Sequence, residues 1–225
     1  MTDFLLLAVF PYVALVLAVA VGLLRYFYDR FSYTSFSSQF LENRQLFWGS
    51  VPWHYSILIL LLAHLLASLF PGPWAALFNR PLRLYILEVT GLALGFTALG
   101  AMGLLILRRI SNRRLFFITS WMDWVLLADL FLQVASGLYV ALAYRWGGGW
   151  YLYTAVPWLW SLVQLSPNVE AVGSLPFMVK FHMFNAFLLL ALLPFSRLLH
   201  LFTLPITYLW RPYQLVIWNR QDRST

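Results

Sequence analysis

The sequence predicts an all-α integral membrane protein with five transmembrane helices, and three observations support this prediction. Of the 225 residues, 62% are hydrophobic and only 10% are charged, whereas about 25% of the residues of a typical soluble domain are charged. Five apolar segments are long enough to cross a bilayer, which takes roughly 20 helical residues. Basic residues gather in alternate connections between these segments, as the topology of membrane proteins requires.

Each apolar segment is predicted to be a helix, because a chain in lipid must pair its own backbone N–H and C=O groups. The segments lack the alternating pattern of barrel strands. The five spans are predicted at residues 4–27, 51–70, 82–107, 120–144 and 177–204. We expect one membrane domain over residues 1–225, in which residues 205–225 form a cytoplasmic tail that contacts a partner.

The distribution of basic residues predicts the orientation in the membrane. Eleven lie in the first and third connections and on the tail side: Arg25, Arg30, Arg44, Arg108, Arg109, Arg113, Arg114, Arg197, Arg211, Arg220 and Arg223. Four lie on the opposite side: Arg80, Arg83, Arg145 and Lys180. Since the side richer in Lys and Arg is the cytoplasmic one, the N-terminus is predicted outside and the C-terminus inside.

Tryptophans near the span ends are typical of the membrane interface. The tryptophans assigned to this interface are Trp53, Trp121, Trp124, Trp158, Trp160 and Trp210. Two of them belong to the long fourth connection, where the aromatic runs WGGGWYLY and VPWLWSLV are compatible with a segment that folds back onto the outer membrane face.

Composition also excludes several classes of site. The sequence contains no cysteine, so it offers no disulfide, thiolate metal ligand, iron–sulfur ligand or cysteine nucleophile. The net charge of +7 does not indicate nucleic-acid binding, because the basic residues cluster at the ends of apolar runs.

All four histidines lie within two of the apolar segments. In the predicted orientation, His54 and His200 lie toward the inner face, and His64 and His182 lie toward the outer face. One imidazole from each of two facing helices is the ligand set of a bis-histidine haem. The sequence therefore predicts two haems between helices two and five, the inner one bound by His54 and His200 and the outer one by His64 and His182.

The spacing of the histidines sets a geometric expectation. Ten residues separate His54 from His64, about 15 Å of helix, and eighteen separate His182 from His200, about 27 Å. Eighteen residues are five whole turns, so the second pair is expected on one face of an ideal helix. The two rises differ, and helix tilt or a kink at Pro194 would absorb part of the difference.

Two other interpretations of the histidines remain open. Histidines in membrane helices also serve as polar contacts between helices. A structural metal site is the weaker alternative, because each depth offers only two histidines and no acidic residue lies within one helical turn of them.

Four stretches of the chain resemble one family. They are RYFYDRFSYTSFSSQFL after the first span, the segment that holds His54 and His64, LRR after the third span, and the run FHMFNAFLLLALLPFSRLLHLFTLPITYLWRPYQLV. With these stretches the chain resembles, over nearly its whole length, the gamma subunit of membrane-bound respiratory nitrate reductase, a di-haem cytochrome b.

The resemblance implies an electron-transfer subunit of an oxidoreductase complex. Menaquinol or ubiquinol would be oxidised near the outer haem, and electrons would pass through both haems to an iron–sulfur beta subunit on the cytoplasmic side. That subunit would supply a molybdenum-containing alpha subunit, which reduces nitrate. The expected location is the plasma (inner) membrane of a prokaryote, and no nitrate chemistry is expected on this chain.

The resemblance also implies a quinol site beside His64. The family often has a lysine near the start of the third span, where this chain instead has Arg83, followed five residues later by Glu88. Arg83 and Glu88 are therefore the predicted quinol contacts, with a mutual ion pair as the alternative.

Arg197 and Lys180 lie near the inner and outer histidines of helix five, and they are the predicted partners of the haem propionates.

Two other functions are compatible with the sequence. The chain could be the cytochrome b anchor of another quinone-linked complex, such as a sulfite-reductase-associated or heterodisulfide-reductase-like assembly. A haem-free membrane anchor or transporter is the alternative from another class. Transport is disfavoured because no span is broken by a glycine–proline pair and no half-chain repeat is evident.

Overall fold

The computed structural model describes residues 1–28, 44–144, 148–196 and 198. Within these ranges the secondary structure is entirely helical. Five helices are long and apolar enough to cross a membrane: Thr2–Tyr28, Gln45–Leu69, Pro81–Ser111, Trp121–Ala143 and Phe177–Phe195. The predicted all-α fold with five helices able to span a membrane is therefore confirmed.

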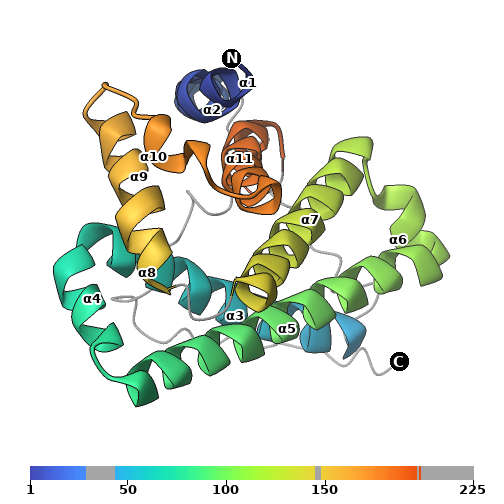
Figure 1. The fold of residues 1–225 in the computed structure, drawn as a ribbon. Helices are drawn as coiled ribbons and strands as arrows, with labels where there is room; N and C mark the ends of the chain where they lie inside the picture. Colours follow the sequence, from blue (N-terminus) through green and yellow to red (C-terminus); the bar gives the residue numbers. More distant parts are fainter. Residues whose placement is uncertain (29–43, 145–147, 197, 199–225) are drawn as a thin grey trace, which may run out of the picture.

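The long helices form an open arrangement in which each packs mainly on its neighbours. The first span comprises α1 (Thr2–Phe4), the π-helical turn η1 (Leu5–Val9) and α2 (Phe10–Tyr28), and the others are built on α3 (Arg44–Leu69), α5 (Pro81–Ser111), α7 (Trp121–Ala143) and α11 (Phe177–Leu192). The helix α3 packs along α5, α5 against α7, α7 against α11, and α11 against α2 (Figure 1). Within the described residues, no extensive contact joins α3 to α11, the two helices that carry histidines.

Short helices connect the spans. They are α4 (Pro71–Phe78), α6 (Arg113–Ile118), α8 (Gly148–Trp150), the π-helical turn η3 (Tyr151–Ala155), α9 (Val156–Val163), α10 (Glu170–Gly173) and the 3₁₀ turn η4 (Leu193–Phe195). Since only the eight-residue α4 and its flanking residues link α3 to α5, the end of α3 that holds His64 lies at the same end of the bundle as the start of α5.

Local sequence explains where several helices begin. Proline occupies the first position of α4 and of α5, where its missing N–H would have no helical partner anyway. The helix α7 begins with a capping box, in which Ser120 N–H donates to Asp123 Oδ2 (2.9 Å) and Asp123 N–H donates to Ser120 Oγ (3.2 Å). The carboxylate of Asp123 thus pairs with an N–H group that the helix itself leaves unpaired.

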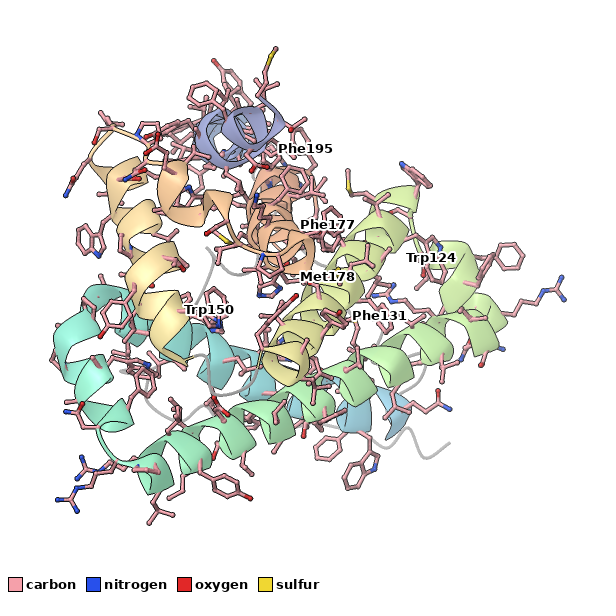
Figure 2. All side chains as sticks on the ribbon, in the orientation of Figure 1. Trp124, Phe131, Trp150, Phe177, Met178 and Phe195 are labelled. Atoms are coloured by element: carbon pink, nitrogen blue, oxygen red, sulfur yellow. The ribbon has the colours of Figure 1, made fainter. Side chains whose placement is uncertain are left out.

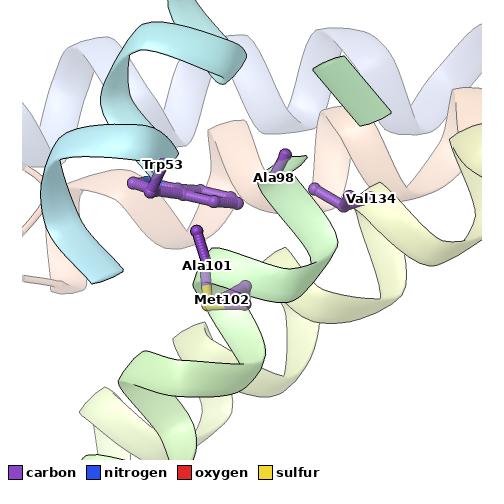
Figure 3. Close-up of a cluster of buried hydrophobic side chains, with 5 residues drawn as sticks. All are labelled: Trp53, Ala98, Ala101, Met102 and Val134. Atoms are coloured by element: carbon purple, nitrogen blue, oxygen red, sulfur yellow. The ribbon is translucent and has the colours of Figure 1, made fainter. Parts of the chain in front are cut away.

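Small residues allow α3, α5 and α7 to approach closely. Trp53 of α3 lies against Ala98, Ala101 and Met102 of α5, and Val134 of α7 completes this buried cluster (Figure 3). Close approach through small side chains is the usual way in which membrane helices pack.

The fourth connection docks on protein. Trp158 of α9 is 1% exposed, and its indole N–H donates to the carbonyl of Leu7 (2.9 Å). That carbonyl cannot accept its usual helical bond, because the residue four positions later is Pro11, which has no N–H. The hydroxyl of Tyr12 in turn donates to the carbonyl of Leu162 (2.9 Å), so α9 is fixed against the first span at two points.

The structure corrects the expectation that two of the tryptophans lie at the membrane interface. Trp53 and Trp158 are core residues, because neighbouring helices cover them. Trp121 and Trp160 are exposed as expected at an interface, and Trp124 lies beside α6, with its ring 5.8 Å from that of Phe116 (Figure 2). Trp210 lies outside the described residues.

The fifth span is interrupted near Pro194. The helix α11 ends at Leu192, a 3₁₀ turn containing Pro194 follows, and Ser196 is extended (φ −110°, ψ 174°). Proline removes a helical donor and crowds the preceding turn, and the guanidinium of Arg25 donates to the carbonyl of Pro194. The described part of the predicted span 177–204 is therefore helical over Phe177–Phe195, with a break after Pro194 where the sequence suggested a kink. His200, Arg197 and residues 205–225 lie outside the described residues.

We predict that Gly49→Val weakens the packing of α3 on α5. A Cβ at Gly49 would lie 2.7 Å from Cδ2 and 2.8 Å from Cγ of Leu105, and overpacking of this kind costs about 1–3 kcal/mol. Gly100→Val on α5 is the matched control, since a Cβ there meets nothing within 4 Å. Thermal unfolding in detergent should show a lower midpoint for Gly49→Val than for the control, and equal midpoints would contradict this packing.

Candidate functional site

His64 lies near the end of α3 that leads into α4. Its Nδ1 is 2.7 Å from the carbonyl oxygen of Leu60, one turn earlier. A carbonyl can only accept, so Nδ1 of His64 carries the proton and Nε2 of the neutral ring keeps a lone pair. The side chain is exposed on the helix surface, and within the described residues no protein group bonds its Nε2.

A group of polar residues from the fourth connection surrounds this end of α3. The hydroxyl of Tyr151 lies 2.8 Å from Ser68 Oγ and 3.4 Å from the carbonyl of His64, and the rings of Tyr151 and His64 meet edge to face at 5.7 Å. The indole of Trp160 donates to the carbonyl of Ser68 (3.0 Å). Burial raises the pKa of the Tyr151 phenol, and its hydrogen bond with Ser68 opposes that rise. The phenol is therefore protonated near neutral pH.

His182 lies on α11 and faces α7. Its Nδ1 is 3.0 Å from Ser136 Oγ, and its Nε2 is 3.5 Å from the amide nitrogen of Gln133. His64 of α3 and His182 of α11 are the two histidines that the sequence pairs at the outer depth.

His54 lies ten residues before His64 on α3, in a similar local setting. Its Nδ1 is 2.7 Å from the carbonyl oxygen of Ser50, and Ser50 Oγ is 3.2 Å away. The carbonyl again fixes the proton on Nδ1 and leaves the lone pair on Nε2. Its predicted partner, His200, is outside the described residues, so the structure describes one member of the inner pair.

The described histidines suit a haem better than a metal ion held by protein alone. Within the described ranges, no group of three or more His, Asp or Glu residues could hold a metal ion. A haem iron needs only two protein ligands, because the porphyrin supplies the other four nitrogens. His64, whose Nε2 has no described partner, matches this requirement, and α3 and α11 do not pack extensively on each other. At His182 the amide nitrogen of Gln133 lies 3.5 Å from Nε2, and iron would have to replace it.

Near His182, the sequence interpretation missed Gln133, Ser136 and Asn185. Asp129, Gln133 and Ser136 of α7 and Asn185 of α11 form a polar group in an otherwise apolar interface. The three α7 residues are spaced four and three apart, which places them on one face of the helix. This spacing of polar residues within an apolar span was the available signal.

Asp129 stands out in this group because one of its oxygens has no partner. The residue is 5% exposed, and Oδ2 makes no hydrogen bond, the one such case among the buried side-chain atoms of the described residues. The amide nitrogen of Asn185 donates to the backbone carbonyl of Asp129 (3.2 Å) and to Gln133 Oε1 (2.9 Å). An acidic group at this depth of a span is costly unless protonated or paired.

The predicted quinol contacts lie in the first turns of α5. Arg83 is exposed and Glu88 is half-buried. Five residues separate them, which places them about 140° apart around the helix. Both residues are described by the structure, and they form no ion pair with each other, so the alternative of a mutual ion pair has no support.

Lys180 is engaged elsewhere than predicted. Its ammonium group lies 2.6 Å from Asp3 Oδ2 and donates to the carbonyl of Gly173 at 2.6 Å. The first contact joins the start of α11 to α1, and the second joins it to α10. The predicted contact of Lys180 with a propionate has no support in this arrangement, and Arg197, the other predicted partner, is outside the described residues.

Comparison with known proteins places the chain in a family. The family model for the nitrate reductase gamma subunit matches residues 3–219. The nitrate reductase gamma chain of Bacillus subtilis (strain 168) is 30% identical over 216 residues, which cover 95% of this chain and 97% of that protein. The respiratory nitrate reductase 2 gamma chain of Escherichia coli (strain K12) is 27% identical over 92% of this chain and 93% of its own length.

A longer relative shares the same region. The nitrate reductase-like protein NarX of Mycobacterium tuberculosis (strain ATCC 25618 / H37Rv) is 33% identical over 210 residues, which cover 91% of this chain but 32% of that protein. The match over almost the whole chain, together with five helices able to cross a membrane, shows that the chain belongs to the nitrate reductase gamma subunit family.

Proposed function

We propose that this chain is the membrane cytochrome b subunit of a respiratory nitrate reductase, with its N-terminus outside and its C-terminus inside the plasma membrane. The observation that carries the proposal is the state of the three described histidines. His54 and His64 each donate from Nδ1 to a carbonyl of their own helix and have no described partner at Nε2. His182 has Ser136 Oγ at Nδ1 and the amide nitrogen of Gln133 3.5 Å from Nε2, a contact that iron would replace.

The pairing of histidines assigns two haem positions. His64 and His182 would hold the outer haem, and His54 and His200 the inner one. A haem with two imidazole ligands supplies an iron that exchanges one electron and has no open position for substrate. The chain holds each described imidazole in one tautomer through a hydrogen bond at Nδ1.

The two ends of the bundle would serve different partners. Menaquinol or ubiquinol would bind near His64, at the end of the bundle where α5 begins, with Arg83 and Glu88 as candidate contacts. Electrons would leave from the inner end to an iron–sulfur beta subunit and then to a molybdenum alpha subunit that reduces nitrate. Residues 205–225 would contact those partners. The family match supports this assignment.

The alternative functions are separable from this one. A cytochrome b anchor of another quinone-linked complex would carry the same haems, and only the partner subunits would differ. The nitrate reductase family match favours the first function. A haem-free anchor or transporter would show no haem absorbance, and the shared tautomer of the histidines argues against it.

Each histidine variant should lose one haem of the two. In the complex purified from membranes supplied with haem, His64→Ala and His182→Ala should each lose the same haem, because removal of either axial ligand opens the same site. His54→Ala should lose the other one. Redox titration followed by absorbance would identify which haem is lost. Loss of different haems by His64→Ala and His182→Ala would contradict the outer pair.

Arg83→Ala and Glu88→Gln test the quinol contacts separately. The variant that removes a true contact should lower kcat/KM for quinol about 10-fold or more, which corresponds to the loss of a charged hydrogen bond of about 1.5 kcal/mol. Arg80→Ala is the matched control, because Arg80 precedes the same helix and is also exposed. If both variants behave like the Arg80 control, neither residue contacts quinol.

A further inference from the structure

The imidazole of His182 is held by a helix other than its own. Its Nδ1 lies 3.0 Å from Ser136 Oγ on α7. The single hydroxyl proton of Ser136 is directed at the carbonyl of Gln133, 3.1 Å away. The serine oxygen is therefore left to accept, and His182 donates from Nδ1–H, which keeps the lone pair on Nε2.

Gly137, the next residue of α7, fixes how closely the ring can approach. A Cβ at this position would lie 2.7 Å from Cε1 of His182, and 3.3 and 3.4 Å from its two nitrogens. Any side chain at position 137 would therefore push the imidazole away from α7. The glycines at positions 100 and 103 of α5 have open space where a Cβ would be, so this constraint belongs to the place where α7 meets the ring.

An amide pair locks the two helices in register around this contact. Asn185, three residues after His182 on α11, is 2% exposed and donates to Gln133 Oε1 and to the carbonyl of Asp129. Since Gln133 Oε1 accepts from Asn185, its amide nitrogen faces Nε2 of His182 at 3.5 Å. The polar face of α7 thus contacts both nitrogens of the ring.

His182 differs in this respect from the two histidines of α3. His54 and His64 each donate to a carbonyl one turn earlier in their own helix, both at 2.7 Å. Those two rings are oriented wherever α3 folds. The orientation of His182 instead requires that α7 and α11 be packed together.

We propose that Ser136 and Gly137 are positioning residues for the outer haem ligand His182, an inference that rests on the proposed haem ligation. Ser136 sets the tautomer and the basicity of the imidazole, and Gly137 sets its distance from α7 and its rotation. A hydrogen bond from Nδ1–H makes the ring a better donor to iron and stabilises the oxidised state. Loss of the Ser136 acceptor should therefore raise the midpoint potential of the outer haem.

The test uses the intact complex with Ser136→Ala, Ser136→Thr, Gly137→Ala and the control Gly100→Ala. Haem content is counted as the pyridine haemochrome, and both midpoint potentials and the low-temperature electron paramagnetic resonance of the oxidised haems are recorded. Ser136→Ala should retain two haems and shift one potential upward, that of the haem lost in His182→Ala. Ser136→Thr keeps the hydroxyl, so the potential of this haem should equal that in the unmodified complex.

Gly137→Ala tests the role of Gly137 separately from that of Ser136. It should change the resonance of the same haem or cause the loss of that haem alone, whereas Gly100→Ala should change neither. Two haems with unaltered potentials and resonances in both Ser136→Ala and Gly137→Ala would overturn the positioning role and leave the proposed function standing. Absence of haem from the unmodified complex would overturn both.

Discussion

One hydrogen bond recurs at Nδ1 of each described histidine, and the proposed haem sites depend on it. An imidazole within an apolar helix can bind iron only if the proton sits on the nitrogen that faces away from the iron, and an acceptor at Nδ1 enforces this. Backbone carbonyls of Ser50 and Leu60 do so on α3, and the Ser136 hydroxyl does so for His182. The same bond supplies a partner for a polar group that lipid cannot solvate.

The order of helix packing keeps α3 and α11 apart. These two helices are joined through α5 and α7, so their backbones do not pack extensively on each other. The fourth connection stabilises this arrangement from the other side, since Trp158 bonds to the first span and Tyr151 and Trp160 bond to the end of α3. These contacts fix α9 against the first span and against the end of α3 that holds His64.

The sequence predicted the features that depend on local chemistry. The spans follow from apolar length, and the structure adds Pro81 and the Ser120 cap as the local reasons why α5 and α7 begin where they do. A kink at Pro194 was foreseen, but its contact with Arg25 was not, because these residues are 169 positions apart in the chain. Trp158 was misplaced because its burial depends on Leu7, far away in the chain. Ser136 and Gly137 were missed because apolar length, not the polar face within α7, guided the interpretation of that span.

Haem stoichiometry of the unmodified chain is the measurement that tests the central claim most directly. A pyridine haemochrome count, with a dithionite-reduced minus oxidised spectrum, should be made on the chain purified with its partner subunits. The expected result is two b-type haems per chain with two separate midpoint potentials. A chain that contains no haem, after production in membranes supplied with haem, would contradict it and would leave the histidines as polar contacts between helices.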